Sequence, residues 1–257
     1  MEQMPDARGA ACGHYACRRM ARYGVLADIH GNREALEAVL EALGARGIER
    51  FLCAGDVVGY NADPEACISL LYGRRCVSVA GNHDLAAVGA ADLSGFSDRA
   101  AYALRRTRKA LRAASLAWLK ALPRARSIDG GIALRHDAPD PHARLSILSE
   151  RHEASFREAD PGRWILSPGA VDASRRASGR LAECAILDTD AWTVEFLRLR
   201  YDAASTEIKA GMGGYRIGPL TARVYALHRR MAYFVAATRS PRSARSGPVS
   251  AASLRNP

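Results

Sequence analysis

Acidic, histidine and asparagine side chains recur along this sequence, each time directly after a short apolar run. They are Asp28 and His30, then Asp56, then Asn82 with His83 and Asp84, and finally His136. Carboxylate and amide oxygens are hard ligands and imidazole is a borderline ligand, whereas no cysteine is placed among them. The residue types therefore predict a site for Mn²⁺, Fe or Zn²⁺ rather than for a metal that selects sulfur.

The spacing of these residues also suits a metal site. Asp28 and His30 are two positions apart, so both side chains can point to one side of an extended loop. A carboxylate such as Asp56 has two oxygens and can bridge a pair of ions. Glycines next to the second and third groups permit tight turns that bring the backbone close to bound ions. They are Gly55, Gly59 and Gly81.

The elements that must position these residues follow from the apolar pattern. Strands are predicted over 23–27, 51–54 and 76–80, and the polar groups come at or just after their ends. Helical spacing of leucine and valine follows the first strand as far as Gly44, and a second helix begins at Pro64. Strands that alternate with helices imply right-handed parallel crossovers, which cluster the polar loops at one edge of a sheet.

The second half of the chain has a different texture. A helix is predicted over 98–122, and two short helices over 203–211 and 217–234. Between them lie short β segments that suggest a second sheet. These segments are 132–134, 145–148, 164–166, 181–187 and 192–197. No internal repeat and no linker separates the two halves, so one domain with two sheets is expected.

Charge and composition set the outer limits of the protein. The 257 residues carry 37 Lys+Arg and 27 Asp+Glu, a net charge of +10, and residues 236–257 include four arginines and no acid. We expect a flexible leader over 1–21, a domain over 22–235 and a disordered basic tail over 236–257. The tail is interpreted as solvated, with weak nucleic-acid contact as the alternative.

The environment of the protein is also constrained. No apolar run approaches the roughly 20 residues of a membrane-spanning helix, which excludes integral membrane proteins. The six cysteines have no regular spacing, and this favours a reduced, cytoplasmic protein.

The ordered series of motifs resembles the calcineurin-like metallophosphoesterase superfamily, and within it the bacterial branch of small YfcE-type phosphoesterases. The resemblance covers about residues 22–230. The motifs that carry it are Asp28-x-His30, Gly55-Asp56-x-x-Gly59, Gly81-Asn82-His83-Asp84, a later strand that ends in His136, and Ser167-Pro-Gly-Ala-Val171.

The resemblance implies a four-layer α/β/β/α sandwich of two mixed sheets, with a dinuclear metal site at the strand ends. By this analogy Asp28, His30 and Asp56 would bind the first ion. The second ion would be bound by Asp56, Asn82 and His136. Manganese is the first choice of metal, with iron, zinc or magnesium as the others.

The resemblance also implies a reaction. His83 would be the general acid or would contact the phosphate, and Asp84 would orient it. Two ions clamp the attacking and leaving oxygens and lower the pKa of a bound water towards about 7. The substrate would be a phosphodiester, a phosphomonoester or a nucleotide. A degenerate member that binds a phosphorylated ligand without turnover is the alternative, and a nuclease-like site ranks last because no aromatic stacking platform was identified.

One family motif is altered in this chain. The family has a Gly-His-Thr-His loop whose two histidines complete the ion sites, and the nearest counterpart here is Glu150-Arg151-His152-Glu153. In the register adopted, Glu153 remains an oxygen ligand. Arg151 cannot ligate, because a guanidinium only donates, and would clamp phosphate instead. One firm ion and a weaker second ion are then expected. A slip of one residue would turn His152 inward and swing Arg151 and Glu153 outward.

Overall fold

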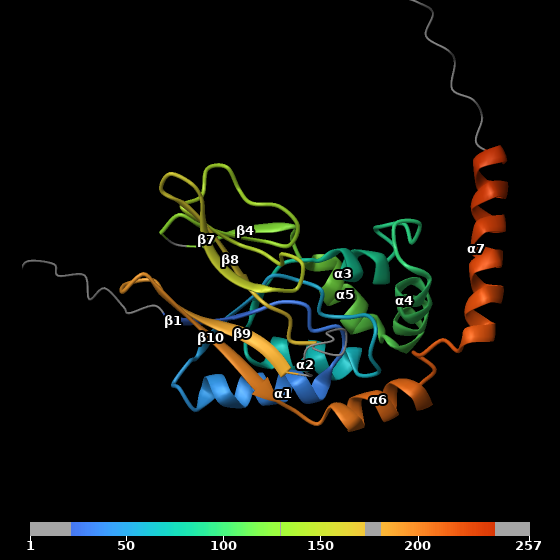
Figure 1. Ribbon diagram of the computed structural model, residues 1–257, viewed down its shortest axis with the longest axis horizontal. Helices are drawn as coiled ribbons and strands as arrows, with labels where there is room; N and C mark the ends of the chain where they lie inside the picture. Colours follow the sequence, from blue (N-terminus) through green and yellow to red (C-terminus); the bar gives the residue numbers. More distant parts are fainter. Residues whose placement is uncertain (1–21, 129, 173–180, 240–257) are drawn as a thin grey trace, which may run out of the picture.

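The computed structural model describes residues 22–128, 130–172 and 181–239, with side chains as far as residue 231. Its strands form two five-stranded sheets that pack face to face, and helices lie beside them (Figure 1). Both sheets mix parallel and antiparallel pairs, which confirms the predicted α/β sandwich fold. The predicted leader and all of the tail after residue 239 lie outside the described residues.

The first sheet carries the predicted parallel strands. Its order is β10-β9-β1-β2-β3. The strands are β1 (Arg22–Leu26), β2 (Arg50–Cys53), β3 (Val77–Ser78), β9 (Leu181–Asp188) and β10 (Thr193–Arg200). β1 pairs in parallel with β2, and β2 with β3, so the ends of these three strands meet at one edge of the sheet.

The placement of β9 and β10 corrects a prediction. Both were expected in the second sheet, but β9 pairs antiparallel with β1, with Val25 opposite Ala185, and β10 pairs with β9 (Figure 1). β9 is buried along almost its whole length, as a central strand must be, and it covers the edge that β1 would otherwise expose. An apolar pattern identifies a strand, but it does not say which distant strand is its partner.

The second sheet has the order β4-β5-β6-β8-β7. Its strands are β4 (Ala125–Ile128), β5 (Ile132–Arg135), β6 (Leu145–Ile147), β7 (Ala154–Asp160) and β8 (Arg163–Pro168). The two edge strands, β4 and β7, were not predicted. Both are largely exposed and charged, so they lack the apolar alternation by which a strand is recognised.

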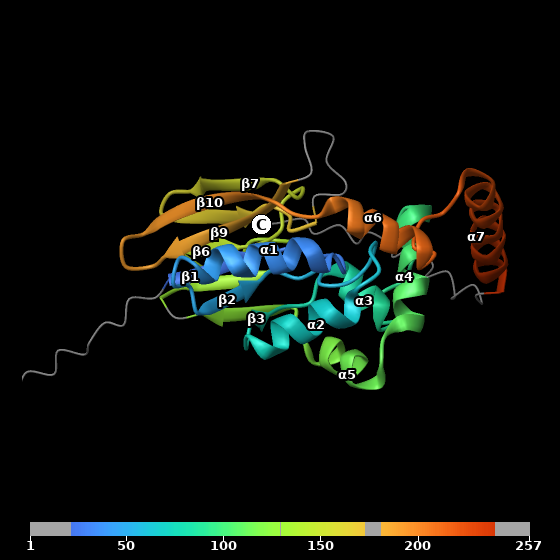
Figure 2. The same cartoon turned by 90° about the horizontal axis from the view of Figure 1, so that it is seen from below.

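Seven helices are described in the chain. They are α1 (Arg33–Gly44), α2 (Pro64–Gly73), α3 (Asn82–Ala87), α4 (Asp98–Ala110), α5 (Ala113–Ala121), α6 (Ala203–Met212) and α7 (Pro219–Arg239). α1 and α2 run along the first sheet (Figure 2). α7 ends at Arg239, so the first four residues of the predicted tail are helical. Among the described helices, none combines the length and apolar character that crossing a membrane requires.

The helix predicted over 98–122 is two helices. Leu111 and Arg112 are extended between α4 and α5, with ψ angles of 133° and 161°. Glu65, from α2, accepts hydrogen bonds from the Arg112 backbone N–H at 2.6 Å and from the Ser115 hydroxyl at 2.8 Å. This carboxylate satisfies the backbone N–H at the start of α5, which has no helical partner, and binds a side chain of its first turn, so it stabilises the break.

The core has two layers, and β1 contributes to both. Tyr23, Val25 and Ala27 face the second sheet, whereas Leu26 packs towards α1. Gly24 lies on the α1 side, where an added Cβ would come within 2.8 Å of Leu43 Cδ1. A glycine at this position therefore allows the C-terminal end of α1 to lie close to the strand.

Candidate functional site

The loops that follow β1 and β2 hold their acidic and histidine residues in an unusual backbone conformation. Asp28, His30 and Asp56 have φ angles of 54°, 51° and 56°. Such left-handed conformations cost roughly 1 kcal/mol or more for a residue other than glycine. The cost is offset because the loops are bonded to one another, with the N–H groups of Ile29 and His30 both donating to the Asp56 carbonyl at 2.9 Å. The backbone thus fixes where these side chains point.

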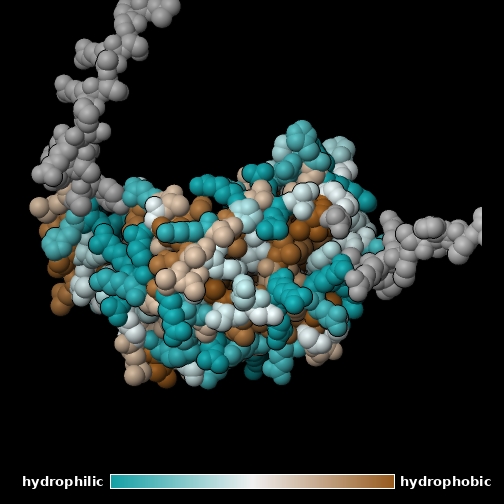
Figure 3. All heavy atoms as spheres, turned by 180° about the vertical axis from the view of Figure 1, so that it is seen from behind, coloured by the Kyte–Doolittle hydropathy of each residue, from teal (hydrophilic) through white to brown (hydrophobic). Residues whose placement is uncertain are grey.

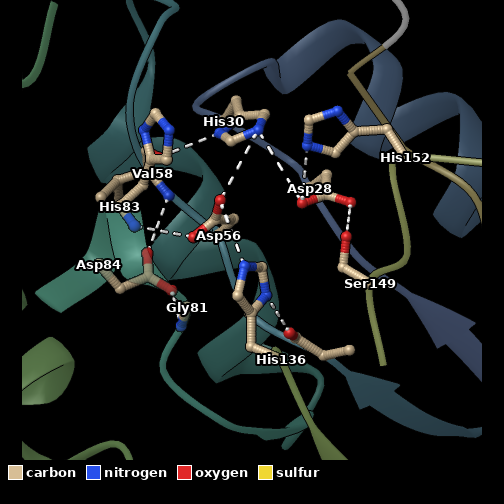
Figure 4. Close-up of polar contacts among 12 residues, drawn as sticks. Asp28, His30, Asp56, Val58, Gly81, His83, Asp84, His136, Ser149 and His152 are labelled. Atoms are coloured by element: carbon tan, nitrogen blue, oxygen red, sulfur yellow. Dashed lines mark hydrogen bonds and ion pairs between the residues drawn. The ribbon is translucent and has the colours of Figure 1, made fainter. Parts of the chain in front are cut away.

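Two imidazoles are oriented by backbone carbonyls. His136 Nδ1 lies 2.7 Å from the Ala54 carbonyl oxygen, and His30 Nδ1 lies 3.4 Å from that of Val58. Since a carbonyl only accepts, each Nδ1 must donate, and each neutral ring keeps its lone pair on Nε2. Those Nε2 atoms lie 3.6 Å and 3.9 Å from Asp56 Oδ2 (Figure 4). A histidine held through Nδ1 with Nε2 turned towards carboxylates is the usual form of a metal-binding histidine.

Asp28 is buried at the centre of the cluster. Its Oδ2 accepts a hydrogen bond from the Ser149 hydroxyl, while Oδ1 accepts none within the described part of the chain. Oδ1 lies 3.5 Å from His152 Nε2 and 4.0 Å from His30 Nε2. Burial, and next the negative charge of Asp56, raise the pKa of Asp28 to about 7. A bound cation would stabilise the ionised form of this carboxylate, which burial and the neighbouring negative charge disfavour.

The donor atoms fit a divalent ion. Three overlapping groups have ligand atoms that all lie within 4.8 Å of one another. They are Asp28, His30 and His152, then His30, Asp56 and His83, and then Asp28, Asp56 and His136. Ligand bonds of about 2.0–2.2 Å place neighbouring donor atoms roughly 3–3.5 Å apart, close to the separations seen here. All of these donors are oxygen or imidazole nitrogen, as Mn²⁺, Fe and Zn²⁺ accept.

A cavity of about 490 Å³ opens beside this cluster. Asp56, His83, His136 and His152 line it from the cluster itself. The wall is completed by Tyr60, Asn82, Gly95, Phe96, Ser97, Ala100, Asp137, Ser149 and Arg151. Asn82 and Arg151 are exposed and the His83 side chain is buried, so an exposed guanidinium and a buried imidazole share one cavity.

His83 is packed among rings. Its imidazole centroid lies 4.6 Å from that of His30, 4.7 Å from Tyr60 and 5.1 Å from Phe96. Gly59 leaves room on another side, because an added Cβ there would come 2.5 Å from His83 Nδ1. The backbone N–H of His83 also donates to Asp56 Oδ1 at 2.9 Å, which fixes the Asp56 carboxylate.

The Asp84 carboxylate binds backbone N–H groups and not the His83 ring, which it was predicted to orient. Its Oδ1 accepts from the Val58 N–H at 3.1 Å and its Oδ2 from the Gly81 N–H at 3.0 Å (Figure 4). Both oxygens are therefore used by the backbone, and Asp84 ties the second and third loops together rather than orienting the His83 ring. Burial is the main cause of its raised pKa.

In the loop after β6, His152 and Glu153 lie as the alternative register describes, whereas Arg151 lines the cavity. His152 points to Asp28, as Figure 4 shows, whereas Glu153 is exposed and belongs to none of the candidate metal groups. Arg151 and His152 have φ angles of 51° and 57°, and the Glu153 N–H donates to the Glu150 carbonyl at 3.0 Å. The segment is a turn, so the alternation of an extended strand, which placed Glu153 inward, does not apply to it.

Three polar residues near the cluster were not identified from the sequence. Ser149 bonds Asp28, while Asn32 Nδ2 donates to Asp172 Oδ1 at 2.9 Å and the Asp172 N–H donates to the Asp28 carbonyl at 2.9 Å. Ser149 follows β6 as the predicted ligands follow their strands, so its position was a usable signal. Asn32 and Asp172 carried no such signal, because 140 residues separate them.

Comparison with known proteins agrees with this geometry. An uncharacterized protein of Methanocaldococcus jannaschii, MJ0912, is 29% identical over 212 residues, which are 69% of this chain and 87% of the relative. A metallophosphoesterase from Sphaerobacter thermophilus superposes with a TM-score of 0.63 and 26% identity, covering 80% of this chain and 98% of its own. The hypothetical protein PH1004 from Pyrococcus horikoshii OT3 gives a TM-score of 0.67 at 18% identity, with the same coverage.

The family of this chain follows from its match to a protein-family model. The model of the calcineurin-like phosphoesterases matches residues 21–179, which include both loops after β1 and β2, α3, His136 and His152. This family uses divalent metals, in agreement with the candidate ligand groups. The chain therefore belongs to the calcineurin-like phosphoesterase family.

Proposed function

We propose that this protein hydrolyses a phosphate ester with the help of divalent metal ions. The observation that best supports the proposal is the pair of imidazoles, His30 and His136, whose Nδ1 atoms are bonded to carbonyls and whose Nε2 atoms face Asp56. The separations of 3.9 Å and 3.6 Å between these Nε2 atoms and Asp56 Oδ2 are longer than a hydrogen bond and leave space for an ion bound by all three groups.

The ligand sets follow from the placement of the donors. Asp28, His30, Asp56 and His152 would hold one ion. Asp56, Asn82 and His136 would hold the other. When bound, such ions polarise the phosphoryl oxygens and lower the pKa of a water molecule to about 7.

The protein's own residues would then position the reaction. Asp56 offers Oδ2 to the cluster because its Oδ1 is occupied by the His83 N–H. In the reaction a water molecule gives up one proton to the solvent and its oxygen bonds to phosphorus, the bond between phosphorus and the leaving oxygen breaks, and His83 supplies a proton to that oxygen. Arg151, exposed at the cavity, donates to the phosphate.

The test compares wild type with Asp56→Asn in hydrolysis of bis-p-nitrophenyl phosphate with added Mn²⁺. We expect the variant to lose at least about 10³-fold in rate, because the shared carboxylate is removed. Asp190→Asn, on the exposed turn between β9 and β10, is the matched control and should keep full activity. A rate that is equal in wild type and Asp56→Asn would contradict the proposal.

A second function is favoured by one observation. Arg151 stands at the cavity, in the loop where the family resemblance leads one to expect two imidazoles. A protein with this change could bind a phosphorylated ligand without turnover. Binding of phosphate esters with no hydrolysis in Mn²⁺, Fe²⁺, Zn²⁺ or Mg²⁺ would support this function instead.

A further inference from the structure

The segment after β10 lies beyond residues 21–179, which the family model matches, and nothing in that match gives it a role. It contains α6, α7 and the turn between them. Two of its arginines, Arg216 and Arg229, reach back to the loops that line the cavity. Each one bonds the backbone carbonyl of an aromatic residue that touches His83.

Arg229, on α7, holds the loop between α3 and α4. Its Nη2 donates to the carbonyls of Leu93 at 2.8 Å and Phe96 at 3.0 Å, and its Nη1 donates to Asp98 Oδ1 at 2.7 Å. The Arg229 side chain is only 9% exposed. A buried guanidinium that bonds two carbonyls and a carboxylate fixes the loop in one conformation, because each of those acceptors would otherwise need another donor.

Arg216, in the turn before α7, holds the loop after β2. Its Nη1 donates to the Tyr60 carbonyl at 2.9 Å and its Nη2 to Asn61 Oδ1 at 3.0 Å. Glu207, on α6, orients the guanidinium through two contacts of 2.9 Å and 3.0 Å. Asn61 Nδ2 in turn donates to the His30 carbonyl at 3.1 Å, so this arginine is two hydrogen bonds away from a candidate metal ligand.

Tyr60 and Phe96 come from different loops and lie against the same imidazole. Their ring centroids are 4.7 Å and 5.1 Å from that of His83. The two arginines therefore fix two of the rings that confine His83. We propose that Arg216 and Arg229 are positioning residues for His83, and that the C-terminal helices are part of the working site. This inference rests on the proposed hydrolysis and on the role of His83 in it.

The way α7 is attached supports this role. Tyr225, also on α7, packs on α4 through a ring contact with Tyr102, 5.4 Å between centroids, and Arg105 lies 5.2 Å over the Tyr225 ring. The opposite side of α7 is exposed, and apolar side chains gather at this end of the molecule (Figure 3). The exposed ones are Leu220, Val224, Leu227 and Met231. The inward side of the helix thus contacts α4 through Tyr225 and the loop that carries Phe96 through Arg229.

The size of the effect follows from geometry. A misplacement of about 1 Å in a reacting group can cost 10²-fold in rate. Removing either guanidinium should therefore lower kcat by about 10–100-fold for esters whose leaving oxygen must be protonated. The loss should be much smaller for p-nitrophenyl esters, whose leaving group departs as an anion, and KM should change little.

The experiment measures kcat and KM over a series of phosphate esters with leaving groups from p-nitrophenol to alkyl alcohols. The variants are Arg216→Ala, Arg229→Ala, Arg229→Lys and His83→Ala, and the control is Arg223→Ala on the exposed side of α7. We expect the loss in both alanine variants to grow with the pKa of the leaving group, as in His83→Ala. Arg229→Lys should recover part of the rate, and the control should match wild type.

Other outcomes overturn the inference in distinguishable ways. If His83→Ala shows the leaving-group dependence and the arginine variants lose the same factor across the whole series, the arginines only stabilise the fold. If wild type hydrolyses no ester, or His83→Ala shows no such dependence, the proposed function fails and the inference fails with it. Should Arg229→Ala not fold, Phe96→Leu removes the ring contact with His83 through which Arg229 is proposed to act, and wild-type leaving-group dependence in that variant would refute the role.

Discussion

The two sheets contribute unequal halves of the candidate metal centre. From the first sheet, the side chains of Asp28 and Asp56 are 0% and 3% exposed. From the second sheet, those of His136 and His152 are 14% and 39% exposed. These two carboxylates, and the His30 imidazole with them, are held inside interlocked loops, whereas the imidazoles of His136 and His152 approach from the open side. The ligands from the first sheet therefore form a rigid half of the candidate metal centre, and those from the second sheet form an open half that solvent and ligands can reach.

The largest effect should come from disturbing the rigid half. An added Cβ at Gly81 would lie 2.5 Å from the Asp56 backbone nitrogen, where nothing can move aside. We expect Gly81→Ala to weaken Mn²⁺ binding by more than about 100-fold, since it displaces the shared carboxylate. Titration calorimetry with Mn²⁺ measures this. Gly44→Ala is the control, because an added Cβ there meets no atom within 4 Å. Equal Mn²⁺ affinity in both variants would show that the position of Asp56 does not depend on the close contact with Gly81.

A smaller effect is expected in the open half. His152→Ala should weaken Mn²⁺ binding by about 10-fold, because the remaining donors and water can replace one exposed ligand. Glu153→Ala should change it less than about twofold, since that side chain is exposed and lies outside the ligand groups. The metal content per chain after dialysis distinguishes them. A loss of metal in Glu153→Ala alone would support the register in which Glu153 is the ligand. A loss of metal in neither variant would exclude both residues as ligands.

The smallest effect concerns stability without metal. The pKa of Asp28 is raised from 3.8 to about 7, so its ionised form destabilises the folded state. That penalty begins as the pH rises above 3.8 and is complete above about 7. In metal-free protein, Asp28→Asn should therefore raise stability at pH 8 by about 1 kcal/mol, or roughly 2–4 °C in Tm, and by less at pH 5. The gain is only part of the roughly 4 kcal/mol that a rise of about three in pKa represents, because the amide must also be buried.

Thermal unfolding in a chelator at the two pH values measures this prediction. With Mn²⁺ the order should reverse, because the amide is the poorer ligand. A metal-free Asp28→Asn protein that is less stable than wild type at pH 8 would show that Asp28 is a structural carboxylate. Asp190→Asn serves as the control for a change of charge on the surface.

Much of the rigid half could be predicted from the sequence. Asp28, His30 and Asp56 directly follow parallel strands, and the carboxyl ends of such strands necessarily meet. The register of His152 could not be predicted in the same way, because it depends on two successive left-handed residues, Arg151 and His152, and neither is a glycine. The alternation of inward and outward side chains, which holds in an extended strand, does not hold where the backbone turns.

Other features depend on contacts that no local pattern contains. β9 belongs to the first sheet because β1 has an open edge, and Arg229 reaches the Phe96 carbonyl across 133 residues of sequence. The family resemblance implied that Asp84 orients His83, yet its oxygens accept from the backbone N–H groups of Val58 and Gly81. Asp84 is the third residue of α3, where a carboxylate can bond the backbone N–H of the residue that caps the helix, and the bond to Val58 spans 26 residues.

The strand order of the first sheet has a consequence for synthesis. β1 lies between β2 and β9, and β9 begins about 150 residues later in the chain. At about 5–20 residues per second, a ribosome leaves the apolar edge of β1 uncovered for roughly 8–30 s. Ser149, which bonds Asp28, also follows that residue by 121 positions. The nascent protein therefore exposes this edge to aggregation before its candidate metal ligands are all in place, and we expect a chain truncated before β9 to bind chaperones rather than to fold.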